Sequence, residues 1–129
     1  MTEDTNPHKG RTGLDRVLRA FGYSMDGLKG AYTGESAFRQ EVWLCAIATP
    51  LAFWLGHGWV EVSLLIGSLV LVLIVELLNS AVEAVVDRVS FELHDLSKRA
   101  KDIASAAVFL SLTLAGGVWG AALWHRLTD

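Results

Sequence analysis

The sequence has a single cysteine and long stretches without any charge. One cysteine cannot form an intrachain disulfide, and Cys45 lies within an apolar run, so we interpret it as a small packing residue. Residues 42–60 and 103–125 contain no Asp, Glu, Lys or Arg, and residues 62–86 contain only two acids. The chain is 52% hydrophobic, with a mean hydropathy of +0.38. A soluble domain of this length keeps a more polar surface, so the composition argues against an ordinary soluble protein.

Three apolar intervals have the length of membrane spans. Crossing ~30 Å of hydrocarbon at ~1.5 Å per residue takes roughly 20 residues in a helix. We therefore predict spans at about 36–55, 62–86 and 103–125. The polar N-terminal segment has no apolar stretch followed by a small-residue cleavage site, so we expect no removable signal peptide. The expected fold class is an all-α membrane protein with one membrane-embedded domain.

The segment before the first span has the pattern of an amphipathic helix. Its apolar residues follow i, i+3, i+4, i+7 spacing: Leu14, Val17, Leu18, Phe21, Met25, Leu28 and Tyr32. We predict a surface helix at 12–34, after a disordered segment at 1–11. A basic amphipathic helix at this place suits the cytoplasmic face of a bilayer, whereas a helix packed on protein would have no soluble core to cover. Residues 87–102 are charged and helix-compatible, and they are predicted to be a cytoplasmic connector.

Lysine and arginine are distributed unevenly along the chain. They are concentrated before the first span and within 87–102, none lies between the first two spans, and only Arg126 follows the third. The positive-inside rule then places the N-terminus and the 87–102 connector in the cytoplasm. The turn at 56–61 and the C-terminus are expected on the outer side.

The second predicted span carries a polar stripe, which consists of Glu76, Asn79, Glu83 and Asp87. At 100° per residue, their spacing of i, i+3, i+7 and i+11 keeps them within about 80° of one another. An ionisable side chain at membrane depth costs at least ~2.5 kcal/mol. Polar residues that only hold helices together would account for Asn79 or Ser80 alone. Two carboxylates, however, repel each other unless a cation or a proton lies between them. The stripe therefore indicates a functional site.

The predicted topology brings acids from all three spans to the cytoplasmic boundary. Glu35 and Glu41 lie at the start of the first span, the stripe ends on that side, and the third span begins after Lys101 and Asp102. Glu35 and Glu41 are six residues apart, hence not on one helix face, and need not share a role. Carboxylates at a hydrated boundary are hard ligands for Mg²⁺, and a further carboxylate can act as a base on a hydroxyl.

The residues alone leave two functional classes open. The chain has no G-x-x-x-x-G-K-[ST] and no G-x-G-x-x-G, so a nucleotide would need a different kind of site. One class is an enzyme that acts on a lipid with a metal-bound co-substrate. The other is a small oligomeric cation channel or carrier that uses Glu76 and Glu83. The outer halves of the spans are apolar, which argues against a continuous ion pathway.

Four segments closely resemble the prokaryotic diacylglycerol kinase family. They are FGYSMDGLKGAY at 21–32, ESAFRQE at 35–41, VELLNSAVEAVVDR at 75–88 and ELHDLSKRAKD at 92–102. The resemblance extends from about Leu14 to Trp124 and includes the three-span layout. The FRQE form is similar to the diacylglycerol branch rather than the undecaprenol kinase branch.

The resemblance implies a multi-pass lipid kinase of the bacterial inner membrane, with a periplasmic C-terminus and an active site at the cytoplasmic interface. It implies ATP-dependent phosphorylation of the diacylglycerol hydroxyl to give phosphatidic acid and ADP, with Mg²⁺ bound together with ATP. Undecaprenol kinase of the same family is the alternative. It also implies a homotrimer with sites shared between neighbouring subunits, membrane lipids as partners, and no nucleic-acid partner.

Roles for individual residues follow from the resemblance by position. Glu76 corresponds to the catalytic base, Asn79 belongs to the same catalytic stripe, and Glu35 and Glu83 correspond to the magnesium ligands. The ATP-contacting positions are Arg16, Tyr23, Glu35, Glu83, Glu92, Leu93, His94, Lys101 and Asp102. The lipid-contacting positions are Ala37, Phe38, Arg39, Gln40, Glu41, Glu76 and Ser105.

Overall fold

The computed structural model describes residues 13–89 and 94–129. Within these ranges the chain forms four α-helices and no strand: α1 (Gly13–Gly34), α2 (Ser36–Leu55), α3 (Trp59–Val89) and α4 (Asp95–Thr128). The predicted all-α fold class is therefore confirmed. The disorder expected at 1–11 lies outside the described residues.

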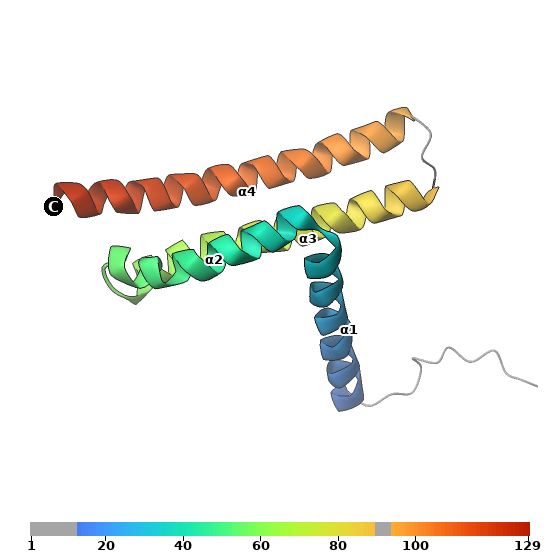
Figure 1. The fold of residues 1–129 in the computed structure, drawn as a ribbon, viewed down its shortest axis with the longest axis horizontal. Helices are drawn as coiled ribbons and strands as arrows, with labels where there is room; N and C mark the ends of the chain where they lie inside the picture. The colour runs from blue at the N-terminus through green and yellow to red at the C-terminus, as the bar shows by residue number, and fades with distance from the viewer. Residues whose placement is uncertain (1–12, 90–93) are drawn as a thin grey trace, which may run out of the picture.

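Three of the helices form an elongated bundle, and the first leaves it at a steep angle (Figure 1). α3 packs against α2 and, most extensively, against α4. The α2–α3 turn and the C-terminus lie at one end of the bundle (Figure 1). The end of α3 and the start of α4 lie at the opposite end, and α1 joins α2 on that side. The polar stripe of α3 thus lies in the half of the bundle to which α1 is attached.

A small cluster of buried apolar residues lies near the α2–α3 turn. Ala52, Leu55 and Leu65 form a fully packed cluster, and residues of α4, including Trp119, cover it. Trp119 Nε1 donates a hydrogen bond to the Leu65 carbonyl oxygen at 3.1 Å, so the indole joins α4 to α3 by a polar contact within an apolar surrounding. The packing of these residues therefore holds α2, α3 and α4 together at this end of the bundle.

The α2–α3 turn depends on two glycines. A Cβ atom at Gly56 would lie 2.7 Å from Val62 Cγ2 and 2.9 Å from the Val62 main-chain nitrogen, too close for any larger residue without a shift of the backbone. Gly58 has φ of 88°, a region that residues with a Cβ rarely adopt. The glycines therefore allow α3 to fold back tightly along α2.

Two helices, α3 and α4, are long and apolar enough to cross a membrane. Only 22% of the apolar window of α3 and 11% of that of α4 is buried within the chain, far less than in the core helix of a soluble protein. The remaining apolar surface needs lipid or other protein around it. α2 does not meet the same criterion, because Arg39, Gln40 and Glu41 lie in its first two turns.

α1 leaves its apolar face uncovered. None of its residues is buried, and four apolar residues near its start are 62–71% exposed: Leu14, Val17, Leu18 and Phe21. Its far end is fixed to α2 through Tyr32. Arg39 Nη1 donates to the Tyr32 carbonyl oxygen at 2.7 Å, and Trp43 Nε1 donates to the Tyr32 hydroxyl at 2.9 Å. The helix is thus tied at one end, with an apolar face available to a bilayer surface.

α3 and α4 both extend into the region expected to be a connector. α3 continues to Val89, and α4 begins at Asp95. The segment 87–102 contains no proline or glycine that would interrupt a helix. His94 caps α4, since its Nδ1 accepts a hydrogen bond from the Leu96 N–H at 3.1 Å. The charges after position 94 therefore lie in the first turns of α4.

Candidate active site

Glu76 lies in the second half of α3 and is only 8% exposed. The side chain is therefore largely withdrawn from water, in a helix whose residues are mostly apolar. Burying a carboxylate in such surroundings is costly unless a proton, a cation or hydrogen bonds compensate it. The position therefore favours a carboxyl group that takes up a proton or meets a charged ligand during function.

Glu41 of α2 faces the same region. Its Oε2 atom is buried and has no hydrogen-bond partner, and its carboxylate interacts electrostatically with Glu76. Its neighbours on the same side of α2 contact the bundle: Phe38 is 3% exposed, and Cys45 Sγ lies 3.8 Å from the Leu69 carbonyl oxygen of α3. Glu41 thus belongs to the face of α2 that is packed toward α3.

Glu35 and Glu83 complete the group of acids around Glu76. Both carboxylates interact electrostatically with it. Glu35 precedes α2 in extended backbone, and its side chain makes no capping hydrogen bond, which leaves the carboxylate available to a ligand. Asn79 Nδ2 donates to Glu83 Oε1 at 3.4 Å, one helical turn away, and so helps to orient that carboxylate. We call Glu35, Glu41, Glu76 and Glu83 the acid cluster.

A cavity of about 470 Å³ lies between α1 and α3 beside Glu35. Its lining consists of small or apolar residues apart from the carboxylate: Gly27, Gly30, Ala31, Gly34, Leu77, Ser80 and Ala81. Cβ atoms at the three glycines would meet nothing within 4 Å, so the space beside this face of α1 is open. The acid cluster therefore has open space at the junction of α1 with the bundle.

α4 supplies a cation at the end of the polar stripe. Lys101 Nζ lies 2.8 Å from Asp87 Oδ1, and it also interacts electrostatically with Glu83. The hydrogen bond with Asp87 raises the pKa of Lys101, so its ammonium group stays charged at neutral pH. Asp102 instead pairs with Lys98 at 2.6 Å. Of the two predicted ATP-contacting residues in α4, Lys101 is the one that the structure joins to the stripe.

Several predicted ATP-contacting residues are not joined to the acid cluster within one chain. Arg16 and Tyr23 are exposed on α1, which runs away from the bundle (Figure 1). His94 is exposed and caps α4. Glu92 and Leu93 lie outside the described residues.

The predicted lipid-contacting residues are divided between buried and open positions. Ala37, Gln40 and Ser105 are exposed. Phe38 is buried against the bundle, and the guanidinium group of Arg39 is turned back toward Tyr32, as described above. Only Glu41 and Glu76 of this predicted set lie in the acid cluster.

The structure brings Glu35 and Glu41 to the same region although they are six residues apart, and whether they share a role stays a prediction. Glu35 lies just outside α2, so the helical period that separates the two residues does not apply to it. Both interact electrostatically with Glu76. The sequence contains a pattern that places Glu41 on the packed face of α2. Phe38, Glu41 and Cys45 follow the i, i+3, i+7 spacing of one helix face.

The same residues lie in the part of the chain that matches a known family. Comparison with models of protein families matches residues 22–123 to the family described as prokaryotic diacylglycerol kinase. The chain belongs to the prokaryotic diacylglycerol kinase family. The match contains the whole acid cluster and Lys101, and it confirms the resemblance seen in the sequence motifs.

Individual relatives agree over nearly the full length. The chain is 52% identical over 118 residues to a diacylglycerol kinase of Pseudomonas aeruginosa, covering 92% of this chain and 96% of the relative. It is 50% identical over 113 residues to a diacylglycerol kinase of Haemophilus influenzae, covering 88% and 96%. It is 49% identical over 115 residues to a diacylglycerol kinase of Escherichia coli K12, covering 89% and 94%.

Proposed function

We propose that this chain is an integral membrane diacylglycerol kinase, which transfers the γ-phosphoryl group of MgATP to the hydroxyl of diacylglycerol. The observation that carries the proposal is the buried carboxyl group of Glu76 with three further glutamates around it. Relatives at about half identity over most of the chain bear the name diacylglycerol kinase. An apolar helix with a buried acid suits a substrate whose reacting hydroxyl lies at the edge of the hydrocarbon.

Glu76 would act as the general base. Its carboxylate takes the proton from the lipid hydroxyl while the hydroxyl oxygen forms a bond to the γ-phosphorus. The bond between the γ-phosphorus and the β–γ bridging oxygen breaks, and ADP leaves with that electron pair. The products are phosphatidic acid and ADP, and the proton on Glu76 is later released to water. Burial of Glu76 supports this role, because a carboxylate poorly solvated by water accepts a proton readily.

Glu35 and Glu83 are the residues that we propose for the magnesium ion of MgATP. Carboxylate oxygens are the ligands that Mg²⁺ prefers in proteins. The donor set fits, since Glu35 is not engaged in a capping hydrogen bond and Asn79 orients Glu83. When bound, the ion neutralises charge on the phosphate oxygens. Glu41, whose Oε2 has no partner, would interact with the lipid hydroxyl or with the proton on Glu76.

The remaining predicted contacts are proposed at the two sides of the acid cluster. Lys101 would contact phosphate oxygens, together with His94, Asp102 and the preceding residues Glu92 and Leu93. Arg16 and Tyr23 on α1 would reach the nucleotide of a neighbouring subunit. Ala37 to Gln40 and Ser105 would line the entry of the lipid.

We propose three membrane spans, α2, α3 and α4, with α1 on the cytoplasmic surface of the inner membrane. α2 lies alongside the two helices that are long enough to span, and so shares their depth (Figure 1). Trp54, Trp59 and Trp124 are 53–80% exposed near the α2–α3 turn and the end of α4. Indoles favour the boundary of a bilayer, which supports an outer interface at this end.

We propose a homotrimer, as the family resemblance implies. The low burial of α3 and α4 leaves much apolar surface to be covered. Gly116, Gly117 and Gly120 have nothing within 4 Å of an added Cβ, so this face of α4 allows another helix to approach closely.

The test of this function is a phosphorylation assay with purified protein in mixed micelles. MgATP with diacylglycerol should give labelled phosphatidic acid, and undecaprenol assayed in parallel should be a much poorer acceptor. Faster phosphorylation of undecaprenol would assign the other branch of the family. Failure to phosphorylate either lipid in protein that is folded and binds ATP would overturn the proposal.

A further inference from the structure

A second cluster of chemically active side chains lies at the end of the bundle opposite the acid cluster. His57 belongs to the α2–α3 turn, whereas His125 and Asp129 belong to the last turn of α4 and its C-cap. One ligand atom from each of the three residues lies within 4.8 Å of the others. The two elements are separated by nearly seventy residues of sequence, so the fold alone brings these side chains together.

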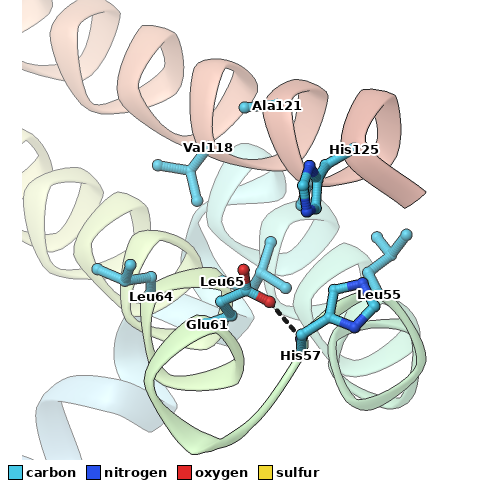
Figure 2. A pocket seen from close by; sticks show the side chains of 9 residues that line it. Leu55, His57, Glu61, Leu64, Leu65, Val118, Ala121 and His125 are labelled. Atoms are coloured by element: carbon cyan, nitrogen blue, oxygen red, sulfur yellow. Dashed lines mark hydrogen bonds between the residues drawn. The ribbon is translucent and has the colours of Figure 1, made fainter. Parts of the chain in front are cut away.

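The geometry of the three side chains suits a shared ligand. The imidazole rings of His57 and His125 meet edge to face, with centroids 5.8 Å apart and planes at 89° (Figure 2). His125 Nε2 lies 2.9 Å from Asp129 Oδ2. Ligand atoms around a tetrahedral zinc ion are about 3.3 Å apart, given bonds of ~2.0–2.1 Å. The His125–Asp129 pair is already within that separation, and small rotations of exposed side chains bring His57 to it.

The residues around the cluster hold His57 in place and add negative charge beside it. The Glu61 carboxylate accepts a hydrogen bond from the His57 main-chain N–H, which fixes the turn that carries His57 (Figure 2). Asp129 and Glu61 bring two acids to this end, and the C-terminal end of α4 adds the negative pole of its helix dipole. Arg126 lies with its guanidinium 4.8 Å from the centroid of the Trp54 ring, and is thus engaged with α2. The cluster favours a cation.

We propose that His57, His125 and Asp129 form a site for a divalent transition-metal ion, with Zn²⁺ the best match. Two imidazoles and one carboxylate are typical zinc ligands, and a water molecule completes the tetrahedron. Mg²⁺ and Ca²⁺ prefer all-oxygen sites and do not suit two imidazoles. Bound zinc ties the α2–α3 turn to the last turn of α4 and so stabilises the outer end of the bundle. The site is independent of the proposed kinase chemistry.

Zinc binding is tested on the full-length protein without an affinity tag, in detergent micelles with millimolar Mg²⁺ to occupy the acid cluster. Calorimetric titration should give one Zn²⁺ per chain. His57→Asn and His125→Asn should each weaken zinc binding by at least about tenfold, and Asp129→Asn should weaken it less. His94→Asn is the matched control: it removes another exposed histidine, and asparagine can still cap α4. This control should bind zinc like the wild type.

Thermal unfolding of the same samples gives a second readout. Zn²⁺ should raise the Tm of the wild type and of His94→Asn, and it should not raise the Tm of a His57→Asn/His125→Asn variant. Without zinc, all these proteins should unfold at similar temperatures, because the substituted side chains are exposed. Zinc affinity that is the same in wild type, His57→Asn and His125→Asn would overturn the proposal. Loss of zinc binding in His94→Asn equal to that in the other variants would overturn it as well.

Discussion

The ammonium group of Lys101 in α4 lies 2.8 Å from the carboxylate of Asp87 in α3. This pair joins the two helices at the end of the polar stripe, where Glu83 also interacts with the lysine. Both side chains are more than 40% exposed. An exposed ion pair contributes little to stability, so the fold should tolerate its loss.

Lys101→Met should therefore impair use of MgATP far more than it impairs the fold. Loss of a charged hydrogen-bond donor to a phosphate should raise KM for MgATP by ~10-fold or more. Asp87→Asn is the matched control, since it breaks the ion pair but leaves the cation in place, and its KM should change less. Steady-state kinetics and Tm measured on both variants check this. A lower Tm with an unchanged KM in Lys101→Met would mean that the pair is structural.

Glu83→Gln should make the enzyme more dependent on Mg²⁺. The change removes one hard oxygen ligand at nearly constant side-chain size, so activity at low Mg²⁺ should fall and excess Mg²⁺ should rescue it only in part. Glu35→Gln should behave in the same way. Asp26→Asn, an exposed change on α1, serves as the control and should follow the wild-type Mg²⁺ dependence. If the magnesium titrations of Glu83→Gln and wild type overlap, Glu83 is not a ligand of the metal ion.

The polar stripe was predictable from the sequence, whereas the full acid cluster was not. A helix has a fixed period, so Glu76, Asn79 and Glu83 had to share a face once α3 was recognised as a helix. The place of Glu35 depends on where α2 begins, and helix ends are poorly determined by local preferences. The electrostatic interaction between Glu41 and Glu76 is tertiary, so sequence periodicity alone gives only the face on which Glu41 lies.

The sequence predicts an apolar span at 103–125 after a helix-compatible connector at 87–102, but it does not show that one continuous helix contains 95–125. Hydropathy reports the surroundings of a helix and not its length, and nothing in 95–102 stops an α-helix. The same reasoning explains α1: the amphipathic pattern predicts a helix, but its steep angle to the bundle depends on the contacts of Tyr32 with α2.

Membrane topology can be mapped with single cysteines, because the native chain has only Cys45. In a Cys45→Ala background, Gly13→Cys and Asp95→Cys should be protected from a membrane-impermeant maleimide in intact spheroplasts, and Thr128→Cys should react. This pattern requires α2 to span together with α3 and α4. If α2 does not span, Gly13→Cys and Asp95→Cys lie on opposite sides and only one of them is protected. Labelling after lysis should reach all three.

Subunit mixing tests whether α1 serves a neighbouring chain. The acid cluster forms within one chain, so mixing Glu76→Gln with Glu35→Gln should restore no activity. Mixing Glu76→Gln with an Arg16→Ala/Tyr23→Ala variant should restore it, because an intact acid cluster then meets an intact α1 of another subunit. Random assembly would repair about a quarter of the sites. Activity no greater than that of the separate variants would mean that α1 serves its own chain or has no part in the site.

Glu76→Gln gives the sharpest test of the mechanism. Glutamine has nearly the same shape as glutamate and keeps one acceptor oxygen, but it cannot take the proton of the lipid hydroxyl. General base catalysis typically contributes ~10²–10⁴ in rate, so kcat should fall by about that factor with little change in KM for MgATP. Tm should be unchanged or higher, because the variant removes an ionisable group that is buried in an apolar helix.

Two other roles for Glu76 predict different results from the same protein sample. If Glu76 only holds helices together, Glu76→Gln should have a lower Tm or lose the oligomer, and its activity should fall only in proportion to the loss of folded protein. A cation channel predicts altered conductance, with no kinase activity in either protein. Glu76→Asp is the matched variant: it keeps a base but withdraws it by one methylene, so it should retain more activity than Glu76→Gln. Single-turnover phosphorylation, ATP binding and Tm on each variant separate these roles. Retention of more than about a tenth of the wild-type kcat in Glu76→Gln would exclude Glu76 as the general base.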